Sequence, residues 1–149
     1  MANFISSSRK RCKMIPKFRG KSIADENKGK WMCGNLIADK TSAYITDGDI
    51  DVCEDFISIE RWCSIDVNTV GQSTGLFDKN GTEIFEGDAL KNNDYPNQTF
   101  ICKHSRLQAS FQAESLNGLL TLSLWKDEER DWQVLGNIYE NPELMEGDA

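Results

Sequence analysis

The sequence predicts a mainly β protein whose short antiparallel hairpins form a small barrel or a pair of packed sheets; an SH3-like barrel is one such form. Two observations lead to this class. The apolar runs are short and alternate with polar residues, and clusters of Gly, Asp and Asn interrupt them. Helix is expected only as a few short turns. The alternative is an α+β fold with a helix inside Asn92 to Ala113, a segment with fair helix propensity.

At 149 residues the chain fits a single domain with one core. Met1 to Lys13 has four basic residues, no acidic residue and no apolar periodicity, which indicates a disordered basic tail. The same run is also what a purine-rich leader would give on translation, so a second interpretation places the native start at Met14. The domain is therefore assigned to residues 14–149.

In the N-terminal half, strands are expected in four segments: from Phe18, at Trp31 to Ile37, at Ala43 to Thr46 and at Phe56 to Cys63. Asp47 to Asp51 is expected to form an acidic turn between the last two strands.

The clearest element is a hairpin within Gly71 to Leu90, where Leu76-Phe77 and Ile84-Phe85 flank a turn. We expect Phe77 to pair with Ile84 and Phe85. The Asp78 carboxylate should accept backbone N–H groups two and three residues on, and Gly81 should take a left-handed conformation.

Beyond the hairpin, Lys91 to Gln98 is expected to be a polar loop. It is followed by a meander at Thr99 to Lys103, Leu107 to Gln112 and Leu119 to Trp125, a charged hairpin end at Lys126 to Asp131, and a closing strand at Trp132 to Leu135. Asn141 should cap a short helical turn that continues to Leu144.

Three blocks of the sequence resemble the YopX family of phage and prophage proteins. They lie at Phe18 to Ile37, at Thr69 to Asp88, which contains Thr-Val-Gly-Gln-Ser-Thr-Gly-Leu-Phe-Asp-Lys-Asn-Gly, and at Leu135 to Leu144. The resemblance spans Met14 to Met145 apart from a middle segment. It implies an accessory protein of a phage or mobile element, and it supplies no biochemical activity.

The chain has a net charge of −7, from 17 basic and 24 acidic residues. An acidic body repels nucleic-acid phosphates unless its basic residues gather on one face. No apolar stretch approaches the roughly 20 residues of a membrane span. We therefore expect a protein of the bacterial host cytoplasm that does not bind membranes.

We predict no metal and no cofactor. The five cysteines include no C-x-x-C pair, and His104 is the single histidine, so free thiols are expected. The acids Asp47, Asp49 and Asp51 do not follow the order of a calcium-binding loop.

We predict that the protein is not an enzyme, and we assign no catalytic residue. His104 is expected to face solvent, without a nucleophile to activate. Glu83, Glu86 and Asp88 are the nearest approach to the carboxylate cluster of a nuclease.

The first functional hypothesis is a non-enzymatic accessory protein that binds a macromolecule, for which a host protein is the expected partner and the binding residues are unknown. Exposed strand edges and four tryptophans also favour a homo-oligomer. The alternative is a small barrel that binds nucleic acid or a nucleotide directly. Its candidate residues are three aromatic and three basic side chains: Trp62, Trp125 and Tyr139, with Arg61, Arg106 and Arg130.

Overall fold

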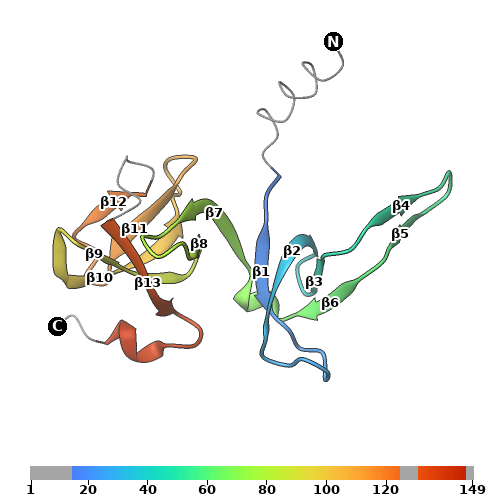
Figure 1. Ribbon diagram of the computed structural model, residues 1–149, viewed down its shortest axis with the longest axis horizontal. Helices are drawn as coiled ribbons and strands as arrows, with labels where there is room; N and C mark the ends of the chain where they lie inside the picture. The colour runs from blue at the N-terminus through green and yellow to red at the C-terminus, as the bar shows by residue number, and fades with distance from the viewer. Residues whose placement is uncertain (1–14, 125–130, 147–149) are drawn as a thin grey trace, which may run out of the picture.

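The computed structural model describes residues 15–124 and 131–146. Within these ranges the protein is mainly β, as predicted, and its strands form a six-stranded, a five-stranded and a two-stranded antiparallel sheet without a closed barrel (Figure 1). The helical elements that lie wholly within the described ranges are short 3-10 turns, η1 (Val67–Thr69) and η3 (Pro142–Met145). None of the described helices is long and apolar enough to cross a membrane. The prediction of a mainly β protein of antiparallel hairpins is therefore confirmed, and of the two forms that it allowed, the described residues form sheets rather than a closed barrel.

The six-stranded sheet contains the N-terminal half of the chain and runs in the order β6-β3-β2-β1-β7-β8. Its strands are β1 (Phe18–Lys21), β2 (Trp31–Ala38), β3 (Ala43–Thr46), β6 (Trp62–Ile65), β7 (Gly71–Phe77) and β8 (Glu83–Phe85). An isolated bridge pairs Ser22, just after β1, with Ile65 at the end of β6. The fit is tight there, because a Cβ on Gly20 would lie 2.0 Å from Ile65 Cγ2. Ala43, Ile45, Cys63 and Ile65 form the buried cluster of this half.

The five-stranded sheet contains the C-terminal half and runs in the order β12-β11-β10-β9-β13. Its strands are β9 (Asp88–Asn92), β10 (Tyr95–His104), β11 (Phe111–Ser115), β12 (Thr121–Ser123) and β13 (Trp132–Asn137). Phe100 has no exposed surface and lies in a second buried cluster with Ile84, Leu90, Leu124 and Trp132. The described residues thus form two apolar clusters rather than the single core expected.

The central hairpin forms with Gly81 in the predicted conformation and Asn80 bonded to Asp78 as predicted, but the second N–H on the carboxylate is that of Thr82 rather than Gly81, and the register differs. Gly81 has a φ of 82°, in the left-handed region. Asp78 Oδ1 accepts from the N–H groups of Asn80 at 2.9 Å and Thr82 at 2.8 Å, two and four residues on. Phe77 pairs with Glu83 rather than with Ile84 and Phe85, because the register shifts along β7. The shift coincides with Gly75, which has a φ of 77°.

Three further expectations on segment boundaries are wrong. The expected loop at Lys91 to Gln98 is mostly strand, because β9 runs to Asn92 and β10 begins at Tyr95. Two strands occupy Asn92 to Ala113, so the alternative α+β fold with a helix there is excluded. The expected strand at Leu107 to Gln112 is largely a turn, and β11 begins only at Phe111.

The C-terminal helical turn forms at Pro142–Met145 with Asn141 at its N-cap position, as predicted, but the Asn141 side chain makes no capping hydrogen bond. The Asn141 side chain instead accepts from the Asn137 N–H at 3.2 Å. The predicted tail at residues 1–13 and most of the charged hairpin end, residues 126–130, lie outside the described residues.

Candidate functional site

A two-stranded arm projects from the N-terminal half and is the most exposed part of the described chain (Figure 1). It consists of β4 (Ile50–Val52) and β5 (Ile57–Ile59), which, within the part of the chain that the structure describes, pair only with each other. The prediction of an acidic turn at Asp47 to Asp51 is therefore wrong, since β4 begins inside that segment. The expected strand at Phe56 to Cys63 is two strands, β5 and β6, which belong to different sheets.

One face of the arm is apolar. The register places Val52 opposite Ile57 and Ile50 opposite Ile59. Successive residues of a strand point to opposite sides, so these four side chains share one face. Ile50, Val52 and Ile57 are 51%, 74% and 65% exposed. An isolated two-stranded hairpin is at best marginally stable in water, and this one gains little from burying its own side chains. We name these four residues the apolar arm face.

The other face and the tip of the arm are acidic. Asp51 lies opposite Ser58 on the reverse face, and Glu54 and Asp55 lie at the exposed tip. Carboxylates also lie at the base of the arm, where the Glu60 side chain accepts from the Asp49 N–H at 3.2 Å. The arm thus combines an apolar surface with a surrounding negative charge.

A cavity of about 680 Å³ lies where the arm leaves the six-stranded sheet. Arg61 and Trp62 line it, and Trp62 is 63% exposed with its ring edge-on to Tyr44 at 5.7 Å. The Arg61 guanidinium is already paired with Asp47, with Nε 3.0 Å from Oδ1. Four acids also line the cavity: Asp25, Glu26, Asp47 and Glu60.

A row of basic residues follows one face of β1, but carboxylates from β8 and from the C-terminal half neutralise it. Lys17 pairs with Glu83 at 2.8 Å and Lys21 with Glu140 at 3.6 Å. Between these two pairs, Arg19 Nη2 lies 2.6 Å from Asp88 Oδ1, with both side chains almost completely buried. This row therefore joins the two halves of the molecule.

Two aromatic rings pack against Arg19 where the two halves of the molecule meet, a contact that we call the joint. The Arg19 guanidinium carbon lies 4.5 Å from the ring centroid of Trp31 and 4.8 Å from that of Phe85. Burial raises the pKa of the Asp88 carboxyl, although the charge of Arg19 and the N–H of Phe85 oppose this rise. The ion pair is thus a structural contact inside the protein.

The structure does not bring the candidate nucleic-acid-binding residues together. Arg61 and Trp62 are neighbours at the base of the arm. Tyr139 is partly buried against Trp31, with ring centroids 5.9 Å apart, and Arg106 is exposed in the turn between β10 and β11. Trp125 and Arg130 lie outside the described residues.

The residues considered for catalysis and metal binding are also dispersed. His104 is exposed, as expected, with its ring edge-on to Phe111 at 5.1 Å. Glu83 and Asp88, two of the three acids considered for a nuclease, are each paired with a basic side chain. Among the described residues, no group of three His, Cys, Asp or Glu side chains is arranged to hold a metal ion. The four cysteines in the described ranges are free, as predicted.

Sequence reasoning missed the apolar arm face. Its signal was present in the sequence, because Ile50, Val52, Ile57 and Ile59 alternate with polar residues around a four-residue turn. The pattern was overlooked because the acidic residues of this segment favoured its interpretation as a turn.

Comparison with known proteins identifies a family and similar solved structures. The family described as YopX protein matches residues 10–146. The crystal structure of protein EF1440 from Enterococcus faecalis is 29% identical in sequence, with a TM-score of 0.53. The match covers 89% of this chain and 99% of that chain. No curated protein matches the sequence.

Proposed function

The chain belongs to the YopX protein family, and from that premise we propose that it is a non-enzymatic accessory protein of a phage or mobile element. In this proposal it acts in the bacterial host cytoplasm by binding a macromolecule, in a host-directed or counter-defence role. The observation that carries the proposal is the apolar arm face. Three of its side chains are more than half exposed, on an arm that pairs with no other strand of the described residues. Exposed apolar surface that is rimmed by polar residues is typical of protein interaction sites.

The negative charge around the apolar arm face indicates what kind of surface the partner should have. Burial of Val52 and Ile57 requires an apolar surface, whereas the acids around them favour positive charge at its edge. A host protein that normally binds nucleic acid has such a basic surface, and the arm would present phosphate-like charge to it. We therefore propose a host protein with a basic-rimmed apolar surface as the partner.

Capture from host lysate with the immobilised full-length chain tests this proposal. The double variant Val52→Thr and Ile57→Thr removes apolar surface and retains β-branched side chains. A Ser58→Thr variant on the reverse face is the matched control. A basic host protein should be recovered by the wild type and the control and lost by the double variant. Failure to recover a partner at low or physiological salt would contradict the proposal.

Direct binding of nucleic acid or a nucleotide is the alternative function. Positive charge on β1 would favour it, but that row is neutralised by Glu83, Asp88 and Glu140. The cavity beside Arg61 is likewise lined by four acids, which disfavour a phosphate. Fluorescence anisotropy with single-stranded oligonucleotides, and thermal shift with nucleotides, distinguish this alternative from protein binding.

We also propose that the protein forms a homo-oligomer in which subunits cover one another's exposed strand edges. Both edges of the β4–β5 ribbon are free of further pairing within the described chain. Light scattering that shows only a monomer at micromolar concentration would rule out this assembly.

A further inference from the structure

The arm and residues 1–13, which we call the N-terminal tail, carry opposite charges. Residues 47–60, which contain the arm, include six acidic residues and no basic residue, whereas the tail includes four basic residues and no acidic residue. In the described part of the chain, Asp47 is the one acid of these six that is paired with a basic side chain, that of Arg61. The other acids of the arm are therefore available to positive charge, and Coulomb attraction favours contact between the two segments.

The tail also contains apolar residues that suit the apolar arm face. Phe4 and Ile5 are adjacent in the sequence, and the basic run at residues 9–11 follows shortly after them. The arm has the corresponding arrangement, with an exposed apolar face and with carboxylates at its tip and on its reverse face. The partner of the arm should combine apolar and basic groups, and the tail combines the same two kinds of group.

The chain that follows the tail enters the six-stranded sheet close to the base of the arm. Phe18, at the start of β1, pairs with Gly34 of β2, and Thr46, the last residue of β3, pairs with the adjacent Asn35. The start of β1 and the base of the arm thus flank one strand and lie roughly 10 Å apart, which is two strand spacings. An extended chain of 13 residues spans up to about 45 Å, and Val52 lies at most about 20 Å beyond Thr46. The tail is therefore long enough to lie along the arm of its own chain.

We propose that the N-terminal tail docks on the arm of its own chain, with Phe4 and Ile5 against the apolar arm face and residues 9–11 beside the free acids of the arm. Because the two segments belong to one chain, each meets the other at an effective concentration on the order of millimolar. The tail then covers the surface that binds the host protein in the proposed function, so that this partner must displace the tail. The inference rests on the proposed function for this last consequence and not for the contact itself.

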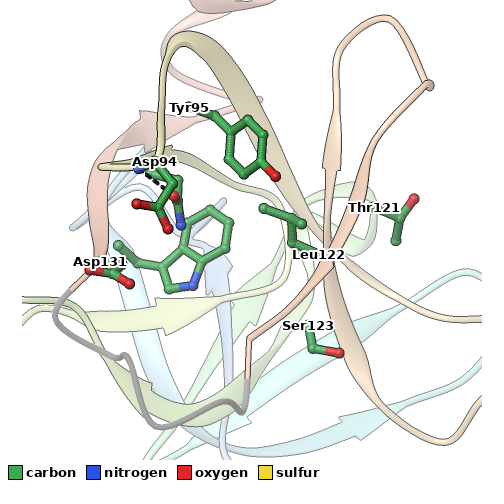
Figure 2. Close-up of a pocket in the computed structure, with 8 residues that line it drawn as sticks. Asp94, Tyr95, Thr121, Leu122, Ser123 and Asp131 are labelled. Atoms are coloured by element: carbon green, nitrogen blue, oxygen red, sulfur yellow. Dashed lines mark hydrogen bonds between the residues drawn. The ribbon is translucent and has the colours of Figure 1, made fainter.

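A pocket in the C-terminal half also places carboxylates beside apolar side chains, and it serves as the internal comparison. It has a volume of about 400 Å³, with Asp94 and Asp131 on one side and Tyr95 and Leu122 on the other (Figure 2). Two carboxylates attract the tail less than the acids of the arm do. The Tyr95 ring is also edge-on to Phe100 of the core at 6.1 Å, so part of its surface is already covered. The tail should therefore leave this pocket unoccupied, and the Leu122 methyl groups report on it.

NMR of the full-length protein, labelled with ¹³C at its Ile, Leu and Val methyl groups, tests the contact. It requires no partner, so its failure is distinct from a failure to capture a host protein. Two tail variants are compared with the wild type: the double variant Phe4→Ser and Ile5→Ser, and the triple variant Arg9→Gln, Lys10→Gln and Arg11→Gln. Each should shift the methyl signals of the apolar arm face. Added salt should shift the wild-type signals in the same direction as the triple variant, because salt screens exposed charges.

The matched control removes three positive charges from exposed lysines outside the tail, with the substitutions Lys28→Gln, Lys40→Gln and Lys91→Gln. It should leave the methyl signals of the arm in place. Unchanged arm signals in either tail variant would overturn the proposal, as would equal shifts in the control or a shift of Leu122 in place of the arm. An effect of the tail variants that appears only at high protein concentration would also overturn it, because the tail would then bind the arm of a second copy.

Discussion

The β4–β5 arm and the five-stranded sheet are built from the same kinds of residue and have opposite relations to solvent. Ile57 in the arm is 65% exposed, whereas Leu90 and Phe100 in the sheet have no exposed surface. Both regions alternate apolar and polar side chains in antiparallel register. The two regions differ in what covers their apolar side chains. Residues of β8, β12 and β13 pack against the apolar side chains of the five-stranded sheet in one cluster, whereas both faces of the arm are exposed. Alternation of apolar and polar residues therefore predicts a strand, but it does not predict whether the apolar face of that strand is buried or exposed.

Substitution of two phenylalanines gives the strongest test of this difference. Phe100→Ala should lower the free energy of unfolding by about 3–5 kcal/mol, because it leaves a cavity in the buried cluster. Phe56→Ala removes the same ring from the arm, where Phe56 is 62% exposed, and should cost no more than about 0.5 kcal/mol. Urea unfolding measures both. Similar losses would show that the arm is packed in solution, against a second copy or another part of the chain.

Substitution in the contact between the two halves should lower the free energy of unfolding almost as much as substitution in the core. Arg19→Ala leaves Asp88 buried without its partner and should cost about 3–5 kcal/mol. Lys103→Ala is the control, since it breaks the exposed Lys103–Glu114 pair and should cost at most about 1 kcal/mol. If Arg19→Ala gave two separate unfolding transitions, the halves would be independent folding units joined by this contact.

Much of the fold was predictable because its signals are local. The turn from Asp78 to Gly81 was anticipated correctly, since a carboxylate near N–H groups and a glycine at positive φ need no distant partner. Pairing of Arg19 with Asp88 could not be predicted, because 69 residues separate them and topology alone brings them together.

The candidate interaction surface was only partly predictable. An acidic segment with nearby apolar residues was evident between Asp47 and Cys63, but not which residues formed a hairpin of their own. Three-residue strands carry too little alternation to be distinguished from a turn.

Asp78 provides a pH-dependent test of the central turn. Burial alone would raise the pKa of Asp78, but N–H groups of Val134, Thr82 and Asn80 outweigh it and lower the pKa below its ordinary value. The unfolded chain then binds the proton more readily, so Asp78 contributes stability above the ordinary carboxyl pKa. That contribution is lost as the pH falls through the lowered folded value.

Asp78→Asn should therefore cost about 1–3 kcal/mol at neutral pH, because its amide nitrogen donates and cannot accept, which leaves at least one of the three N–H groups without an acceptor. The difference from wild type should shrink in acid, as measured by urea unfolding at several pH values. A constant difference across this range would show that ionisation of Asp78 does not stabilise the turn.

Gly81 tests backbone strain alone in the same turn. A Cβ at Gly81 meets no atom within 4 Å, so any cost must come from its φ of 82°. Gly81→Val should cost at least about 1 kcal/mol, since β-branched residues strongly disfavour positive φ. Gly81→Asn should be milder, because Asn tolerates the left-handed region. Equal melting temperatures for the two variants would contradict this explanation of the turn.

The smallest expected effect on stability belongs to Ile57→Thr in the apolar arm face. Threonine keeps the β-branched shape and removes apolar surface that is already mostly in water, so the change should stay within about 0.5 kcal/mol. Ile84→Thr in the C-terminal cluster is the matched substitution at a buried site and should cost several times more.

Thermal unfolding should be measured over a range of protein concentrations, since oligomer stability depends on concentration. A loss for Ile57→Thr that appears only at high concentration would identify a second copy as the occupant of the arm. If the loss is absent at every concentration, the apolar arm face is free in the isolated protein and available to a different partner.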